Sequence, residues 1–199
     1  MGSINNPKKF IFIAGFVTLI GIGGLGLLLI YFFHKEVWHA IVNVGIESLL
    51  RQFITGTVYA LVTLIPLVLL LERRMLDATR YFFADLMKKF TVSTPEIFLL
   101  SLCAGVGEEL LFRGAIQPWI GIWPTAIIFI ALHGYLNPKD RPLFIYGMVL
   151  LLVSAGFGYL LPFSGIYAAM AAHFWIDVVL MLYLKRNSGK HFVGSFMQF

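Results

Sequence analysis

A series of apolar runs constrains this sequence more than any other feature. The first run, Phe10 to Phe33, contains no charged residue, and a membrane-spanning helix needs about 20 mostly apolar residues. Further runs follow at 52–71, 97–117, 123–136, 143–161 and 166–184. We therefore predict an all-α polytopic membrane helix bundle of about six transmembrane helices, in which the fourth helix is short.

The composition agrees with a membrane protein and excludes other classes. Hydrophobic residues make up 59% of the chain and charged residues only 13%, whereas a soluble domain carries about 25% charged residues. The single cysteine, Cys103, excludes a disulfide scaffold. The net charge of +5 does not indicate a nucleic-acid partner, because basic residues of membrane proteins gather on the cytoplasmic side.

The basic residues predict the topology. Six spans place both termini on one side, and with the N-terminus inside only Lys35 and Arg51 fall outside. The predicted cytoplasmic set is Lys8, Lys9, Arg73, Arg74, Arg80, Lys88, Lys89, Lys139, Arg141, Lys185, Arg186 and Lys190. The first run is longer than the 7–15 residues of a signal-peptide h-region, so we predict a retained anchor. We expect a multi-pass protein of the cell (inner) membrane with both termini cytoplasmic.

The chain reads as a single membrane domain, 1–199, with a two-helix anchor at 10–71 and a catalytic helix core at 96–185. Between the second and third spans, apolar residues recur at helical spacing over 76–90, which predicts an amphipathic helix at the cytoplasmic surface. The outer segment 37–50 is predicted to lie on the membrane surface or to act as a lid.

Three glycines in the first run imitate a nucleotide-binding motif. Gly21, Gly23 and Gly26 satisfy G-x-G-x-x-G, but that motif requires a preceding strand and a helix N-terminus. Inside an apolar helix, small residues let neighbouring backbones approach closely. We interpret these glycines as helix-packing positions.

The informative residues are the ionisable ones inside the spans. Such residues cost roughly 2.5–3.5 kcal/mol at a helix centre and normally face a polar interior. They are Glu108, Glu109, Arg113, His133, His173 and Asp177. At a rise of about 1.5 Å per residue, Glu109, His133 and His173 come out at a similar height, so we predict that three helices direct polar side chains into one buried pocket.

Helical spacing suggests how they pair. Glu109 and Arg113 are four residues apart and share a face, whereas Glu108 points about 100° away and stays free of that pair. His173 and Asp177 are also four apart, so the carboxylate can orient the imidazole.

Phe129 and His133 share a face of the short fourth helix in the same way. A helix shorter than the bilayer admits water, which hydrolysis inside a membrane requires. A carboxylate and a neutral histidine beside one water form a general-base system, so the predicted chemistry is hydrolysis of a peptide bond within the bilayer. Alone, the Glu109–Arg113 pair would be a structural contact.

Three motifs, in order on separate helices, then resemble a known family. They are Glu108–Arg113 (E-E-x-x-x-R), Phe129–His133 (F-x-x-x-H) and His173–Asp177 (H-x-x-x-D). Together they resemble the CPBP family of intramembrane proteases, which includes CAAX endopeptidases and bacteriocin-processing enzymes. The resemblance implies an intramembrane endopeptidase of glutamate type acting on a membrane-anchored protein or peptide, such as a CAAX-type tail, a sorting signal or a bacteriocin leader.

The resemblance also implies roles for these residues. Glu108 would be the activating base, assisted by His133, and His173 with Asp177 would stabilise the oxyanion. Structural support would come from Glu109, Arg113 and Phe129. Asp177 departs from the family pattern, because the CAAX enzymes carry Asn and an ionised carboxylate cannot donate a hydrogen bond. Asp177 is therefore either protonated or an orienting partner of His173.

Several alternatives stay open. We expect no cofactor, but Glu108, His133 and His173 could hold zinc with an open position, although the sequence lacks H-E-x-x-H. A serine protease using Ser154 with His173 would leave the other charged residues unexplained. A non-catalytic membrane scaffold or a proton-coupled transporter are the remaining classes. The sequence does not fix the oligomeric state.

Overall fold

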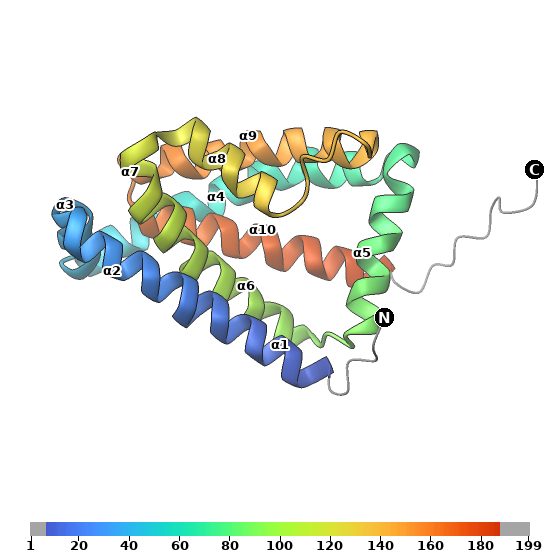
Figure 1. The fold of residues 1–199 in the computed structure, drawn as a ribbon, viewed down its shortest axis with the longest axis horizontal. Coiled ribbons are helices and arrows are strands. Elements are labelled where there is room, and N and C mark those ends of the chain that lie inside the picture. Colours follow the sequence, from blue (N-terminus) through green and yellow to red (C-terminus); the bar gives the residue numbers. More distant parts are fainter. Residues whose placement is uncertain (1–6, 188–199) are drawn as a thin grey trace, which may run out of the picture.

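The computed structural model of the chain describes residues 7–187, which form helices and no strands (Figure 1). The elements are α1 (Pro7–Phe16), η1 (Val17–Ile22), α2 (Gly23–Phe33), α3 (Lys35–Val42), α4 (Ile46–Leu71), η2 (Arg74–Leu76), α5 (Asp77–Lys89), α6 (Thr94–Glu109), η3 (Leu110–Ile116), α7 (Gln117–Ile120), α8 (Ile122–Leu132), α9 (Arg141–Phe163) and α10 (Ile166–Asn187). The predicted all-α class is confirmed. Lys190, one of the predicted cytoplasmic residues, lies outside the described residues.

Four helical stretches are long and apolar enough to cross a membrane. They are 8–33, α4, α9 and α10. A fifth is obtained if α5 and the helix from Thr94 to Ile120, which are bent by 110° to each other, count as one span. The prediction of six spans also counted the fourth run, but α8 has only 11 residues. The chain is therefore a multi-pass membrane protein whose fourth predicted span is a short helix.

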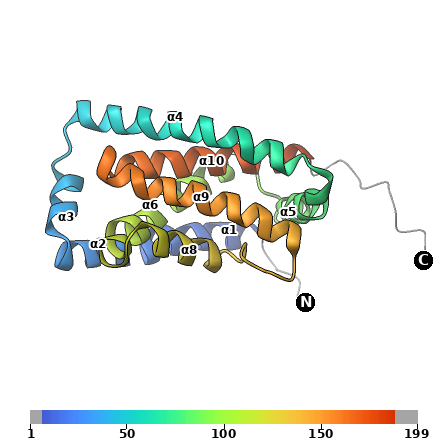
Figure 2. The same cartoon turned by 90° about the horizontal axis from the view of Figure 1, so that it is seen from above.

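Helix α10 lies inside the bundle, between α4 on one side and α6 on the other (Figure 2). Small residues allow the close approach of α4: Gly56 faces the carbonyl oxygen of Ala168, and a Cβ at Gly56 would collide with it. Ala168, Ala169 and Ala172 of α10 have no exposed surface and pack in the core formed with α4 and α9. The consequence is that α10 cannot rotate without disrupting two neighbouring helices.

The first helical stretch, α1 to α2, packs along α6. A Cβ added at Gly26 would lie 2.6 Å from the backbone nitrogen of Leu111, and one at Gly23 would lie 2.9 Å from Cα of Gly107. Both neighbours are backbone atoms, so the two helices touch main chain to main chain. The predicted packing role of Gly23 and Gly26 is confirmed, whereas Gly21 is exposed and has only a side chain of its own helix nearby.

The outer segment 37–50 is predicted to be one surface element or a lid, but in the structure it is divided between two helices. Its first part lies in α3, and its last part begins α4 at Ile46, ahead of the predicted start at Gln52. The chain leaves the helical conformation at Asn43–Gly45, where Gly45 is extended (ψ 156°). Helix α4 then tolerates the charged Arg51, because that side chain points away from the bundle while Gln52 is buried.

The predicted amphipathic helix is α5, which crosses the ends of the other helices (Figure 1). On the predicted apolar face, Leu76 of η2 and Thr79 are buried, whereas Leu86 is exposed. In the turn to α6, Ser93 and Glu96 form a capping box, and Lys8 of α1 donates to both Glu96 oxygens at 2.8 and 2.6 Å. We refer to this side of the molecule as the α5 end.

Helix α8 ends four residues before the predicted limit at Leu136. Gly134 adopts a left-handed conformation (φ +79°), its N–H donates to Ala131, and the N–H of Tyr135 donates to Ile130. These two bonds form a Schellman motif, the common glycine-dependent helix end. His133 is therefore the C-cap residue of α8 rather than a residue inside a span.

Candidate active site

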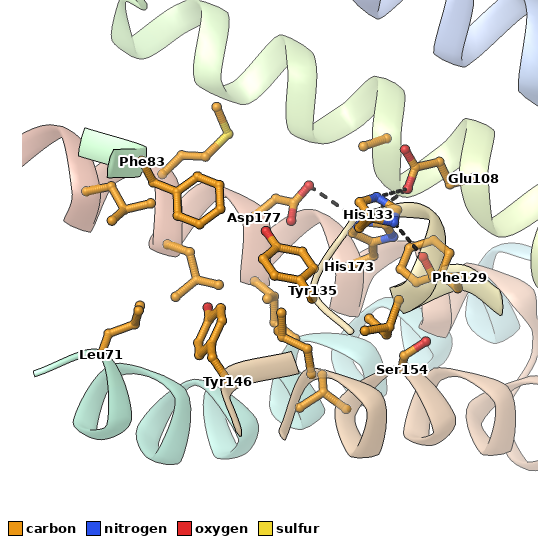
Figure 3. Close-up of a pocket in the computed structure, with 18 of the residues that line it drawn as sticks. Leu71, Phe83, Glu108, Phe129, His133, Tyr135, Tyr146, Ser154, His173 and Asp177 are labelled. Atoms are coloured by element: carbon orange, nitrogen blue, oxygen red, sulfur yellow. Dashed lines mark hydrogen bonds and ion pairs between the residues drawn. The ribbon is translucent and has the colours of Figure 1, made fainter. Parts of the chain in front are cut away.

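The four predicted catalytic residues meet in one cavity of about 320 Å³, lined by residues of α4, α5, α6, α8, α9 and α10 and of the loop after α8. Glu108, His133, His173 and Asp177 all line it, and Figure 3 shows them converging from α6, the end of α8 and α10. The rest of the lining is mainly apolar and extends to Leu86 and Met87 of α5. The predicted convergence is thus found for Glu108, His133, His173 and Asp177, whereas Glu109 and Arg113 do not line the cavity and His133 is exposed instead of buried.

Glu108 is the acidic residue that the structure leaves available. Its Oε2 atom lies 3.6 Å from Nε2 of His133 and 3.9 Å from Nε2 of His173. This oxygen is buried and accepts no hydrogen bond in the described part of the chain. A buried acceptor without a partner is costly and calls for an explanation, and a proton or a water molecule held for chemistry would provide one.

Glu109, the next residue, is committed to the protein interior. Its Oε1 accepts from Nη1 of Arg113 at 3.1 Å, and both side chains are almost fully buried. The other terminal nitrogen of Arg113 donates to the carbonyl oxygen of Ser154 at 3.0 Å and to its hydroxyl at 2.6 Å. The Phe129 ring covers the guanidinium at 4.6 Å. The predicted Glu109–Arg113 pair is confirmed, and it also joins α6 to α9.

His173 is held at both ring nitrogens. Nδ1 lies 2.8 Å from Oε1 of Glu109, and Nε2 lies 3.5 Å from Oδ2 of Asp177. The Phe157 ring stacks on the imidazole with an interplanar angle of 18°. Since Glu109 accepts, Nδ1 carries a hydrogen, and Nε2 is the nitrogen that faces the cavity. The predicted reach of Asp177 to the imidazole is confirmed.

His133 presents the same nitrogen to the cavity. Its Nδ1 lies 2.7 Å from the carbonyl oxygen of Phe129, which can only accept, so the hydrogen is on Nδ1. The ring packs on that of Phe129 with centroids 4.5 Å apart, as the shared face predicted. Both Nε2 atoms therefore face Oε2 of Glu108, with lone pairs available when the rings are neutral.

The geometry bears on two alternatives, a zinc site and a serine protease. Within residues 7–187, no group of three or more His, Cys, Asp or Glu side chains is arranged to hold a metal ion. The zinc set of Glu108, His133 and His173 stays a prediction for a chelator experiment. Ser154 bonds to Arg113 and, over the described residues, makes no hydrogen bond to His173. The predicted serine-protease alternative thus lacks its nucleophile–base contact.

The structure adds three residues that the sequence reasoning missed. Tyr135 and Tyr146 line the cavity, and Phe83 of α5 touches the Tyr135 ring, with centroids 6.0 Å apart. The His-Gly dipeptide at 133–134 was the available signal for Tyr135, because glycine after a C-cap predicts the Schellman turn that places this ring. Nothing local pointed to Tyr146, since its contacts join different elements.

Comparisons with known proteins agree with the resemblance. Residues 90–179 match the family described as "Type II CAAX prenyl endopeptidase Rce1-like". We refer to residues 90–179 as the Rce1-like segment, since they are similar to this family. The match contains all the motif residues from Glu108 to Asp177 and covers just under half of the chain. The predicted division at 10–71 and 96–185 stays a prediction, although the second range overlaps the Rce1-like segment.

One curated relative is the "Uncharacterized protein YpbD" of Bacillus subtilis (strain 168), 34% identical over 94 residues. The aligned part is 47% of this chain and 48% of the relative, so the chain spans about half the length of the curated relative it matches. No solved structure matches the chain. The Rce1-like segment is thus similar to a family whose description names a prenyl endopeptidase.

Proposed function

We propose that this protein is an intramembrane endopeptidase in which Glu108 activates the attacking water. The observation that carries the proposal is the buried, unpartnered Oε2 of Glu108, which both histidine Nε2 atoms face at 3.6 and 3.9 Å. A general base must lie within reach of the water it deprotonates and have no stronger partner. Oε2 of Glu109 is also buried without a hydrogen-bond partner in the described residues, but Glu109 does not line the cavity and its Oε1 is already bound by Arg113 and His173.

The proposed reaction is peptide hydrolysis. Glu108, assisted by His133, takes a proton from water while the oxygen bonds to the substrate carbonyl carbon, so that a tetrahedral oxyanion forms. The proton then passes from Glu108 to the leaving nitrogen as the C–N bond breaks, which leaves an amine and a carboxylic acid. His173 and Asp177 are proposed to stabilise the oxyanion. Asp177 can contribute a donor only when it is protonated.

The cavity lining supports a membrane-tethered substrate. From Glu108 towards the α5 end, the wall is formed by apolar side chains that include Met181, Leu184, Leu71, Phe83, Leu86 and Met87. Burial of an apolar group there gains roughly 25 cal/mol per Å². A substrate with an apolar or lipidated terminal segment fits this wall, which favours a CAAX-type tail, a C-terminal sorting signal or a bacteriocin leader.

The distribution of basic residues supports an orientation in the cell membrane. The α5 end carries Arg73, Arg74, Lys88 and Lys89, and positively charged loops mark the cytoplasmic side. We propose that the α5 end and both termini are cytoplasmic. The predicted outer residue Arg51 then lies in α4 near the opposite end.

The decisive experiment follows cleavage of candidate membrane substrates by the purified protein in lipid vesicles. Glu108→Gln and His133→Ala are compared with wild type, with and without a chelator. Loss of roughly 10²-fold or more in rate is expected for each, in line with general-base catalysis. Unchanged processing in both variants would favour a non-catalytic scaffold. Chelator sensitivity would instead favour the zinc form of the protease.

A further inference from the structure

The cavity is poor in uncommitted hydrogen-bond donors. The Nδ1 hydrogen of His133 is directed at Phe129, and that of His173 at Glu109. A hydrogen on Nε2 of His173 would face Asp177 at 3.5 Å. A tetrahedral oxyanion nevertheless needs donors aimed at it. This inference rests on the proposed function and asks which group supplies the missing donor.

Three hydroxyl groups line the cavity, those of Tyr135, Tyr146 and Ser154. The Ser154 oxygen already accepts from Arg113 at 2.6 Å and lies almost completely buried. Over residues 7–187, neither the Tyr135 nor the Tyr146 hydroxyl makes a hydrogen bond. A phenol is neutral at physiological pH, so it can donate without a proton being taken up. The two tyrosines are therefore the candidates.

Tyr135 is held beside His133, the residue proposed to assist Glu108, and Tyr146 is not. The Schellman motif that ends α8 places His133 at the C-cap and Tyr135 two residues later, with its N–H bonded to Ile130. The Tyr135 ring is parallel to the His133 ring, with an interplanar angle of 10° and centroids 6.3 Å apart. Figure 3 shows the Tyr135 hydroxyl turned towards Asp177, while Tyr146 lies beside Leu71.

The main chain of Tyr135 is held as well. Its carbonyl oxygen packs against Gly147 of α9, where a Cβ would collide with it. Tyr146, one residue earlier on α9, supports the Tyr135 ring edge-on, with centroids 5.9 Å apart. Phe83 of α5 closes the other side. The hydroxyl is thus carried by a ring with little freedom to move, which is what a preorganised donor requires.

We propose that the Tyr135 hydroxyl donates a hydrogen bond to the oxyanion of the tetrahedral intermediate. It supplies the neutral donor that an ionised Asp177 cannot provide. The substrate carbonyl would then lie between Glu108 with its water on one side and Tyr135 on the other. The hydroxyl keeps its proton throughout, and its bond to the oxygen is strongest when that oxygen carries the full negative charge.

The test is Tyr135→Phe, which removes the hydroxyl and keeps the stacked ring. We expect kcat to fall by roughly 10²-fold, the usual cost of one oxyanion donor, with KM unchanged because the interaction belongs to the transition state. Tyr159→Phe, on the exposed surface of α9, is the matched control and should behave as wild type. Tyr146→Phe should have a much smaller effect than Tyr135→Phe.

The same Tyr135→Phe change in an Asp177→Asn variant provides a second test. Asp177→Asn introduces an amide donor of the same shape, so the loss caused by Tyr135→Phe should shrink in that background. A Tyr135→Phe variant with wild-type kcat, alongside an inactive Glu108→Gln variant, would overturn the role of Tyr135 and leave the proposed function standing. A loss confined to Tyr146→Phe would also overturn it. Full activity of Glu108→Gln would overturn both proposals.

Discussion

Glu108 and Glu109 are neighbours in the chain but lie in two different environments. The Glu109 side of α6 is a closed network away from the cavity, in which Arg113, His173 and Ser154 connect Oε1 of a fully buried carboxylate to α9 and α10, and Oε2 has no partner in the described residues. The Glu108 side opens on the cavity, and its buried oxygen accepts no hydrogen bond in the described residues. A rotation of about 100° along one helix therefore separates a structural carboxylate from an available one.

The difference shows how a membrane protein can keep a reactive group in place. Buried ion pairs contribute little net stability but are costly to break, so the Glu109 network fixes helix positions without serving as the base. Glu108 can then keep an oxygen without a hydrogen-bond partner, because the contacts of the neighbouring Glu109 determine its position. The four predictions below test this division, from the largest expected change in stability to the smallest.

The largest effect is expected for Arg113→Met. It leaves the Glu109 charge buried without its cation, at a cost of about 3–5 kcal/mol, or a fall in Tm of roughly 6–20 °C for a chain of this size. Thermal unfolding in detergent measures it, with the exposed Arg186→Met as control. A Tm within the error of the control would show that the Glu109 side is not a closed network.

The second-largest loss of stability is expected at the contact between the first helical stretch and α6. A methyl group at Gly26 would lie 2.6–2.8 Å from the backbone of Leu110 and Leu111, which follow the two glutamates. Gly26→Ala is therefore expected to cost about 1–3 kcal/mol, as overpacking does, and to reduce cleavage by moving α6. Gly24→Ala, with nothing within 4 Å, should change neither. Equal behaviour of the two variants would refute the backbone contact.

A smaller, pH-dependent effect is expected where α1 meets the start of α6. Lys8, with the Ser93 cap, lowers the pKa of Glu96 from 4.5 to about 2. Glu96 lies in the first turn of α6, ahead of the apolar run. A lowered pKa in the folded state stabilises the protein fully above about 4.5, and this is lost as the pH falls towards 2. Glu96→Gln should lower Tm by roughly 2–4 °C at pH 7, as a lost cap does, and by less at pH 3.

The smallest change in stability is expected for Glu108→Gln. Replacement of an unpartnered buried carboxylate by a neutral amide removes a desolvation cost, so Tm should stay the same or rise while cleavage is lost. Unfolding curves and cleavage rates from the same preparation measure both. A fall in Tm comparable to that of Arg113→Met would mean that Glu108 belongs to the structural network and would remove the contrast between the two sides.

Local spacing predicted part of the site correctly. The Glu109–Arg113 and His173–Asp177 contacts follow from a four-residue separation on one helix, and the composition of the runs gave the all-α class. The limits of α8 and α4 were wrong, since the left-handed turn at Gly134 and the break before Ile46 depend on single backbone conformations. The bond from Arg113 to Ser154 and the place of Tyr135 in the cavity had no counterpart in the spacing.

The sequence by itself determined which side chains share a helix face, because the period of an α-helix is fixed by its backbone hydrogen bonds. It also determined which segments prefer lipid, because that depends on composition. Only the tertiary structure decided that Glu109 meets His173, 64 positions away, and that Glu108 remains free. Contacts between helices depend on how far each is rotated and shifted, and close packing at positions such as Gly26, Gly56 and Ala168 sets both.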